Sequence, residues 1–488
     1  MAKRSKSTFE RLSGSRRKRT QRRDLRRRVA AGDPGLTIVN PHAGGIDVGN
    51  ASHFVAVPPD RDAHPVQEFG SWTADLIRMA EWLKACRIDT VAVQATGVYA
   101  IPLYDVLTEH EIRVVRVNAQ HTKNVPGRKS DVPECQWLMK LHTYGLLRDS
   151  FRRDEKMQSV RTIWRLRDRH VKDASGAIQH MQKALTKMNI QLANVISDIR
   201  GVTGQAIIAA ILQGERDPYQ LADRKDERVK ASREEVARSL AGNWRDDLLF
   251  ELQQAVDSFH FAHLQMQECH RKLENFLASL PTRTLDIPSE PVGAKADTVL
   301  KPRKAKRAKK PKRPRGNEPT LDLEGELKRI CGVDLTSIDG INVITAQTII
   351  AEIGTDLSGF PTENHFASWL GLTPGKDISG GKVIGRGRRK GQNRVAAALR
   401  IAATTLLESK SYLGGRHLRR PLPSKTAAVK AMARHPGVLV YRLLTYGQAW
   451  VDRGAAKFEQ KRAELELARL NFQARTRGYK LTPITQAS

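Results

Sequence analysis

Cysteine is scarce in this chain of 488 residues, and its four copies, Cys86, Cys135, Cys269 and Cys331, lie far apart. No C-x-x-C pair occurs, so the sequence predicts neither a zinc site nor a disulfide framework, and a reducing compartment fits. Apolar runs of about 18 residues, the length that crosses a bilayer, are also lacking. The N-terminus is charged where a signal peptide needs an apolar core. We therefore expect a cytoplasmic protein with no membrane partner.

Acidic residues are outnumbered, because 83 Lys and Arg face 52 Asp and Glu and leave a formal net charge of +31. An excess of this size favours a nucleic acid as the partner, since each neutralised phosphate releases counterions. A merely soluble basic protein is the alternative. The length, with a hydrophobic fraction of 40%, allows about two to four domains, each with its own core.

Two segments are rich in cations and poor in large apolar residues. Residues 1–36 contain RRKRTQRRDLRRR and predict a disordered basic arm, because they bury too little surface to fold alone. The arm is either a nucleic-acid tether or a solubilising tail. Residues 284–320 contain KPRKAKRAKKPKRPR and predict a Lys- and Pro-rich linker that touches nucleic acid.

Residues 37–153 alternate between strand and helix patterns. The segment 44–60 predicts two strands joined by a Gly-Asn turn, and VQEFGSW predicts a third strand. Three strands, helix, strand, helix, strand and helix is the element order of the ribonuclease H-like fold. The later elements are expected as a helix at 73–86, a buried strand at 88–95, a helix at 99–109, a strand at 112–118 and a helix at 131–144.

Acidic and amide side chains fall at the ends of these elements. Asp47 closes the first strand, Gln94 ends the fourth, and Asp131 and Glu134 share one face of a helix. Three carboxylates and an amide at one end of the sheet would hold Mg²⁺, and two such ions clamp a phosphoryl displacement. Taken singly, Asp47 has the alternative role of a turn residue beside Gly49. Asp131 and Glu134 have the alternative role of acids that stabilise a helix N-terminus. The joint placement favours the metal site.

Residues 154–283 predict a helical coiled-coil region, because apolar side chains recur at spacings of three and four along two seams. The simplest use is an antiparallel helical hairpin or a subunit contact. His263 and His270 are expected to pack in the second seam rather than bind metal. The charged run 224–238 is expected to be a connector or a solvated helix. The seams are Ile178, Met181, Leu185, Met188, Leu192, Val195 and Ile199, then Leu249, Leu252, Val256, Phe259, His263, Met266, His270, Leu273, Leu277 and Leu280.

Residues 321–488 predict a mainly helical C-terminal domain. The segment 335–354 resembles a helix-hairpin-helix, and 394–407 predicts a strong helix. Between them, KDISGGKVIGRGRRKGQNR places Ser379 before two glycines and a row of cations. Ser379 is a candidate nucleophile held against a polyanion; alternatively, the Ser-Gly-Gly turn caps a helix or closes a hairpin and the charges form a solvated rim. The candidate phosphate-binding cations are Lys382, Arg386, Arg388, Arg389, Lys390 and Arg394.

Five stretches together resemble one family: GIDVGNASH, ATGVYAIPLYDVL, VNAQHTKNVPGRKSDVPECQWLMKLHTYGLLRDSF, IDGINVITAQTIIAEIG and FASWLGLTPGKDISGGKVIGRGRRKGQNRVAAALRIAA. In these motifs and their order the chain resembles the DEDD transposases of bacterial insertion sequences, a group of bridge-RNA-guided serine recombinases. The resemblance implies a RuvC-like domain with an acidic tetrad, a coiled coil for assembly, and a C-terminal transposase domain with a nucleophilic serine.

By position, the resemblance places the tetrad on Asp47, Gln94, Asp131 and Glu134, and the serine on Ser379. Gln94 replaces the usual acid and Glu134 replaces an aspartate, which leaves the number of metal ions open. Asp47, Asp131 and Glu134 are the expected ligands of Mg²⁺, for which Mn²⁺ could substitute. The two domains are expected to close together into a composite active site.

The resemblance also implies a tetramer around a non-coding bridge RNA that pairs with donor and target DNA. Arg128 and Lys129 are further expected nucleic-acid contacts, and the protein would lie at the bacterial nucleoid when active. The leading hypothesis is a transposase that cleaves and rejoins DNA through a serine-phosphodiester intermediate. A metal-dependent junction endonuclease and a non-catalytic nucleic-acid-binding protein derived from a transposase are the alternatives.

Overall fold

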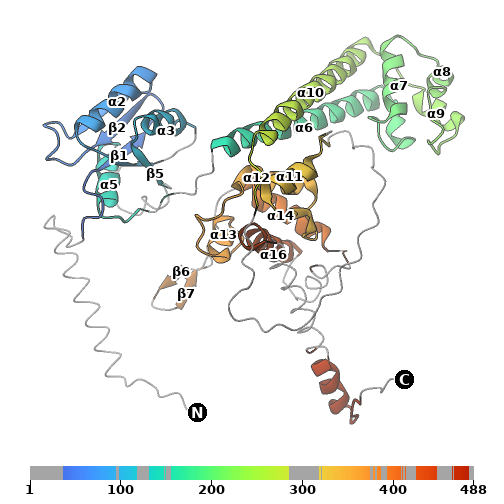
Figure 1. Cartoon of the computed structure of the whole chain (residues 1–488). Coiled ribbons are helices and arrows are strands. Elements are labelled where there is room, and N and C mark those ends of the chain that lie inside the picture. Colours follow the sequence, from blue (N-terminus) through green and yellow to red (C-terminus); the bar gives the residue numbers. More distant parts are fainter. Residues whose placement is uncertain are drawn as a thin grey trace. The chain divides into compact units, whose positions relative to one another are not determined.

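The computed structural model of the chain divides into two compact units, Met1–Arg152 and Arg153–Ser488 (Figure 1). The predicted basic arm and most of the predicted linker lie outside the described residues. The residues that the structure describes are 37–94, 98–117, 131–147, 149, 155–284, 318–319, 321–373, 377–379, 382–385, 393–407, 409, 413, 425–447, 464 and 467–482.

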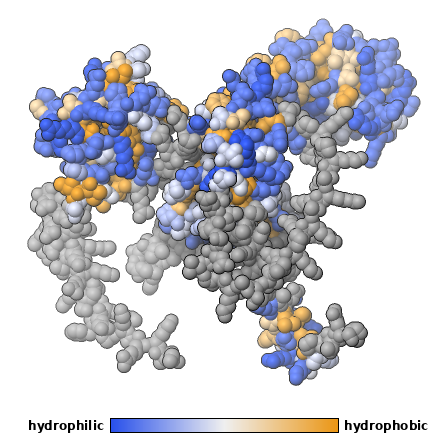
Figure 2. Space-filling model, viewed as in Figure 1, coloured by the Kyte–Doolittle hydropathy of each residue, from blue (hydrophilic) through white to orange (hydrophobic). Residues whose placement is uncertain are grey.

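Hydrophilic side chains cover most of the described surface in the view of Figure 2, with apolar patches scattered among them. Scattered apolar side chains are ordinary on a protein surface. Within the described ranges, no helix combines the length and the apolar character needed to cross a membrane.

The first unit is built on a mixed five-stranded sheet with the order β3-β2-β1-β4-β5. β1 pairs antiparallel with β2 and parallel with β4; β2 pairs antiparallel with β3, and β4 pairs parallel with β5. Every residue of β4, TVAVQ, is buried, as a parallel strand covered on both faces requires. The strands are β1 Ala43–Val48, β2 Ser52–Ala56, β3 Val66–Gly70, β4 Thr90–Gln94 and β5 Arg113–Val117.

Helices cover both faces of this sheet. α2 (Thr73–Ala85) and α3 (Ala100–Glu109) share a buried apolar cluster with Ile46 on one face. α5 (Asp131–Thr143) packs against β1, β2 and β4, where Cys135 lies in a second cluster with residues of the other face. The predicted element order and the ribonuclease H-like fold are confirmed, with strand and helix ends that differ by one or two residues.

A long helical hairpin forms the first part of the second unit. α6 (Glu155–Lys187) and α10 (Asp246–Ala278) pack along each other. They run antiparallel, because Lys187 Nζ at the end of α6 lies 2.6 Å from Glu251 Oε2 near the start of α10. Of the two predicted uses of the apolar seams, the structure therefore shows the antiparallel hairpin.

The first predicted seam runs too far along the chain. α6 ends at Lys187, and Asn189 follows with a left-handed φ of +57°, which an L-residue adopts at a helix end. Met188, Leu192 and Ile199 are instead buried in a small helical bundle. The chain forms this bundle after α6 and before α10. The three-and-four spacing continues past the helix end because other helices bury these residues. That bundle comprises η1 Leu192–Asn194, α7 Val202–Leu212, α8 Pro218–Ala222 and α9 Arg233–Leu240.

The charged run 224–238 is only partly the predicted connector. Its second half begins α9, where Ser232 and Glu235 form a reciprocal capping box that satisfies two N-terminal donors. Val236 and Leu240 are fully buried, so one face of this helix belongs to the bundle core. The prediction of a solvated helix is wrong for that face.

The C-terminal part is mainly helical, as predicted, and it carries one short hairpin. In the helix-hairpin-helix-like element, the expected first helix at 335 is only a 3₁₀ turn, η2, whose N-cap Asp334 accepts hydrogen bonds from Thr336. The turn that follows contains Gly340 with φ +85°, which suits glycine. The elements are α11 Leu323–Cys331, η2 Leu335–Ser337, α12 Val343–Ile353, α13 Glu363–Trp369, β6 Asp377–Ser379, β7 Lys382–Gly385, α14 Arg394–Thr405 and α16 Lys425–Tyr446.

Candidate active site

Asp47 and Gln94 lie side by side on two parallel strands. Asp47 of β1 and Gln94 of β4 are direct Cα partners, so their side chains leave the same face of the sheet. Gln94 is 7% exposed and Asp47 is half-buried. The predicted meeting of these two strand ends is therefore present in the structure.

Glu134 completes this arrangement from the helix above. The Gln94 amide Nε2 donates to the Glu134 carboxylate Oε2 at 3.3 Å, and Glu134 itself is half-buried. This contact joins residues that are 40 positions apart in the sequence. The sheet and α5 thus bring the Glu134 carboxylate to the Gln94 amide, and Asp47 lies beside Gln94 on the neighbouring strand.

Asp131 is the first residue of α5, and its side chain lies outside the described part of the structure. Residues three apart on a helix share a face, so the backbone places Asp131 on the Glu134 face. Among the side chains that the structure describes, no three His, Cys, Asp or Glu residues form a group that could hold a metal ion. The Asp131 carboxylate is the predicted third member of such a group.

The donor types at this site fit a hard divalent cation. Carboxylate and amide oxygens are the ligands that Mg²⁺ and Mn²⁺ prefer. The Gln94 amide donates a hydrogen to Glu134, which orients the Glu134 carboxylate, and the amide also carries an oxygen, the donor type that such a cation prefers. Asp47, Glu134 and Asp131 are the residues that would hold the ion, with Gln94 beside them.

The far end of α5 is attached to the sheet by a buried histidine. His142 Nε2 and Thr90 Oγ1 of β4 lie 2.9 Å apart. Burial lowers the His142 pKa to about 4, with a further contribution from the cation Arg113, so the imidazole is neutral at physiological pH. The Thr143 carbonyl accepts from the backbone N–H of Val39 and Asn40. Sequence reasoning missed this attachment because its partners are distant in the chain.

Ser379 is the last residue of β6 and pairs directly with Lys382, the first residue of β7. The two strands that flank the Ser-Gly-Gly turn thus form a hairpin, and the assignment of Ser379 as the nucleophile stays a prediction. The side chains of both residues lie outside the described part, as do four predicted phosphate contacts of this stretch and two of the first unit. These are Arg386, Arg388, Arg389 and Lys390, and then Arg128 and Lys129.

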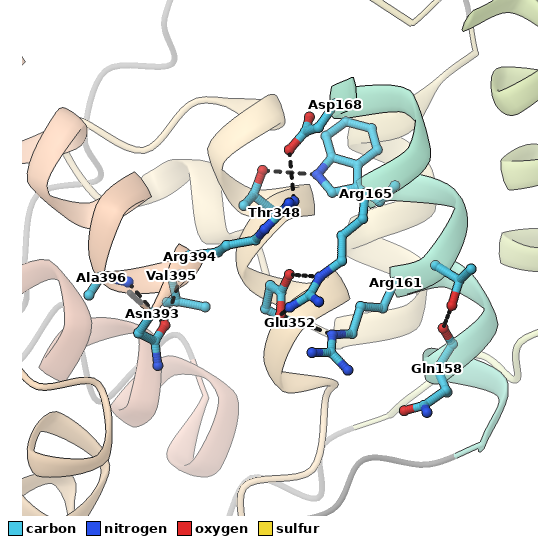
Figure 3. Close-up of polar contacts among 12 residues, drawn as sticks. Gln158, Arg161, Arg165, Asp168, Thr348, Glu352, Asn393, Arg394, Val395 and Ala396 are labelled. Atoms are coloured by element: carbon cyan, nitrogen blue, oxygen red, sulfur yellow. Dashed lines mark hydrogen bonds and ion pairs between the residues drawn. The ribbon is translucent and has the colours of Figure 1, made fainter. Parts of the chain in front are cut away.

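The serine stretch leads into α14, whose start is firmly placed. Asn393 caps the helix by accepting from the backbone N–H of Val395 at 2.9 Å and of Ala396 at 3.3 Å. The guanidinium of Arg394, a predicted phosphate contact, lies 3.5 Å from Asp168 Oδ2 of α6, and the Arg394 side chain is 40% exposed (Figure 3). An exposed guanidinium at this distance remains available to a stronger anion.

A buried carboxylate joins α12 to α6 beside this point. Glu352 is 5% exposed and accepts from Arg165 Nε at 2.6 Å and Arg165 Nη2 at 2.8 Å, a bidentate pair, and from Arg161 Nε at 3.1 Å (Figure 3). Trp164 Nε1 also donates to Thr348 Oγ1 at 3.0 Å. A buried carboxylate needs such paired donors to offset its desolvation. The contacts hold α12, and with it the neighbouring α14, on the helical hairpin.

The two seam histidines pack as predicted. His270 Nε2 accepts from Arg167 Nε at 3.1 Å, and burial together with that cation lowers the His270 pKa to about 4. The ring centroids of His263 and Phe259 are 4.4 Å apart, an ordinary aromatic contact. Neither histidine belongs to a metal-binding group among the described residues.

Two protein-family models match the regions that carry these residues. A DEDD transposase model of the IS110 type, described as Transposase, matches residues 44–190, and the model described as Transposase IS116/IS110/IS902 family matches residues 334–418. The first range contains the four tetrad positions and the second contains Ser379. A comparison with curated proteins gave no match.

Proposed function

This chain belongs to the IS116/IS110/IS902 family of transposases, enzymes that cleave and rejoin DNA, and we propose that it does so through a serine-phosphodiester intermediate with the help of Mg²⁺. The observation that carries the metal part is the contact of Gln94 with Glu134 directly beside Asp47. A cation bound there would supply Lewis-acid stabilisation of charge on a phosphodiester oxygen. Mn²⁺, which also prefers oxygen ligands, is the expected substitute.

The covalent step belongs to Ser379. Its Oγ attacks a DNA phosphorus atom, a serine-phosphate bond forms, the bond to one deoxyribose oxygen breaks, and the serine proton passes through solvent to that oxygen. Attack by the hydroxyl of another strand reverses these changes and frees the serine. Because each phosphodiester bond is exchanged for another, the rejoining needs no external energy source. A position at the end of a paired strand holds the serine backbone in place for this attack.

Basic side chains around the serine would bind the DNA backbone. The candidates of the second unit follow Ser379 directly in the sequence, where they would stabilise the charge that develops on phosphate during attack. The candidates of the first unit precede Asp131 by two and three positions. These are Lys382, Arg386, Arg388, Arg389, Lys390 and Arg394, and then Arg128 and Lys129.

Sequence specificity in this proposal lies in a bridge RNA that pairs with donor and target DNA, and four copies of the chain assemble around it in the bacterial cytoplasm, at the nucleoid. The net charge of +31 supports a polyanionic scaffold of this kind. Sequencing the RNA that co-purifies with the full-length protein tests the idea. A single discrete transcript encoded beside the gene is expected, whereas a random sample of cellular RNA contradicts it.

Gln94 supplies a sharper test of the metal site. An amide offers Mg²⁺ a neutral oxygen but no charge. Gln94→Glu is therefore expected to lower the Mg²⁺ concentration for half-maximal recombination, or at least to retain activity. Gln94→Leu keeps similar bulk and removes both the oxygen and the donor to Glu134, so we expect a loss of about 10- to 100-fold. Recombination is measured for both variants across a Mg²⁺ titration.

Full activity of Gln94→Leu at every Mg²⁺ concentration would show that position 94 takes no part in the chemistry. Absence of recombination by the wild-type protein at every Mg²⁺ concentration would instead favour the third hypothesis, a non-catalytic nucleic-acid-binding protein. Inactivity of both variants with unchanged DNA binding would instead mean that the amide donor to Glu134 is itself required.

A further inference from the structure

The backbone of α5 approaches the sheet closely at Gly45, two residues before Asp47. A Cβ atom at position 45 would lie under 3.0 Å from the Cys135 carbonyl oxygen and the Met139 backbone nitrogen. Both atoms belong to the helix backbone, which cannot rotate away as a side chain could. Only glycine permits this contact between strand and helix.

Cα partners on neighbouring strands form rows across the sheet, and successive rows along β1 lie under successive turns of α5. Gly45 pairs with Ala56 on one side and Ala92 on the other, so small side chains flank the contact. The next row toward the carboxyl end of β1 contains Asp47 and Gln94. The helix contacts the first row through Cys135 and Met139, and Glu134, adjacent to Cys135, therefore falls over the second row.

A second attachment lies in the row on the other side. Thr90 of β4 is the Cα partner of Ala43, and its hydroxyl lies 2.9 Å from His142 Nε2, two turns of α5 beyond Glu134. The neutral, buried imidazole makes this a fixed contact. Two separated contacts, one steric and one polar, determine both the height of α5 above the sheet and its position along the strands.

We propose that Gly45 and the Thr90–His142 pair are positioning residues that hold α5 so that Glu134 reaches Gln94 and Asp47. A side chain at position 45 would lift the helix by about 1 Å, a displacement sufficient to disrupt a catalytic geometry. None of these three residues would touch the cation or DNA. The inference rests on the proposed metal site, since it names what places one of its carboxylates.

The test uses the full-length protein and Mn²⁺ as the probe, with free Mn²⁺ measured by electron paramagnetic resonance. The binding that Asp47→Asn abolishes defines the site. Gly45→Ala is expected to weaken this binding about 10-fold or more, and Thr90→Val, which removes the hydroxyl without adding bulk, to weaken it by a smaller factor. Wild-type affinity in either soluble variant overturns the role of the residue that it replaces.

Gly44→Ala is the matched control. The three atoms nearest to a Cβ at position 44 would be in the side chains of Val91 and Ile88, at 3.0 and 3.4 Å, and the Ala56 carbonyl oxygen at 3.4 Å, none of which belongs to α5. Mn²⁺ affinity should therefore remain near that of the wild type. An equal loss in Gly44→Ala and Gly45→Ala would mean that any bulk in β1 perturbs the site, and would overturn the proposal. If Gly45→Ala does not fold, the Mn²⁺ affinity of Thr90→Val tests the proposal on its own.

Amide hydrogen exchange supplies a measurement that needs no metal. Faster exchange along Asp131–Thr143 is expected in Gly45→Ala and not in Gly44→Ala, because the helix loses its close contact only in the first. Equal exchange in both variants contradicts the positioning role. A wild type without Asp47-dependent Mn²⁺ binding, combined with faster exchange in Gly45→Ala, would overturn the proposed metal site while the role of Gly45 in placing α5 stands.

Discussion

Asp47→Asn is expected to lower the rate of DNA strand cleavage by at least about 10³-fold, equivalent to about 4 kcal/mol of transition-state stabilisation, while DNA and RNA affinity change little. The substitution keeps the size of the side chain and its place beside Gln94, but it removes a charged ligand from the proposed cation site. Single-turnover cleavage and equilibrium binding of the same DNA measure the two effects separately.

Asp131→Asn should behave in the same way, because the sequence assigns it to the same group of ligands. Asp89→Asn is the matched control, since Asp89 is exposed and precedes β4 at the end opposite Gln94. Asp89→Asn removes an equal charge from the same unit, but at the end of β4 that lies away from the proposed cation site. A wild-type cleavage rate in Asp47→Asn or in Asp131→Asn would disprove the corresponding ligand assignment.

The sheet was predictable because its signals are local. Alternating and continuous apolar runs mark strands and helices within a few residues, and Asp47 and Gln94 meet because parallel neighbours bring their carboxyl ends to one edge. The role of Gly45 was not predictable, since a glycine can occur within a strand for several structural reasons. The reason here is the close approach of α5, whose contacting residues follow about 90 positions later. A single sequence does not show which residues that far apart are in contact.

The helical hairpin shows where periodicity fails. The apolar spacing of α6 continues through Met188 to Ile199 although the helix stops at Lys187. Burial alone produces that spacing, and here the burial comes from separate short helices. The left-handed Asn189 marks the true end. Asparagine adopts this conformation more readily than most residues, but it is also frequent at other caps and turns, so the residue type alone does not fix the helix end.

The pairing of Glu352 with Arg161 and Arg165 was equally hidden. Glu352 is buried, and its partners Arg165 and Arg161 lie 187 and 191 residues away in the sequence. Such a pair is retained only when both sides are present, because either charge alone in the interior is costly. It indicates that the helical hairpin and the serine-bearing part of the chain are held together by more than apolar packing.

Replacing Ser379 by Ala is the second substitution with a large expected effect. If the hydroxyl is the nucleophile, Ser379→Ala should form no covalent protein-DNA adduct, and recombination should fall by at least about 10³-fold. Folding, assembly and DNA binding should persist, because the hydroxyl is lost from the end of a short strand whose backbone pairing with Lys382 remains. Adducts are trapped with DNA that carries a nick beside the cleavage site and are detected by denaturing electrophoresis.

Ser368→Ala is the matched control, because it removes a half-buried hydroxyl from α13 in the same part of the chain. It should retain adduct formation. Continued strand cleavage by Ser379→Ala, with free hydroxyl ends and no adduct, would support the metal-dependent endonuclease and disprove the serine intermediate. An adduct mapped to another residue of Ser379→Ala would keep covalent chemistry but move the nucleophile. Loss of adduct in Ser379→Ala alone, with equal DNA affinity in both variants, leaves the Ser379 hydroxyl as the attacking group.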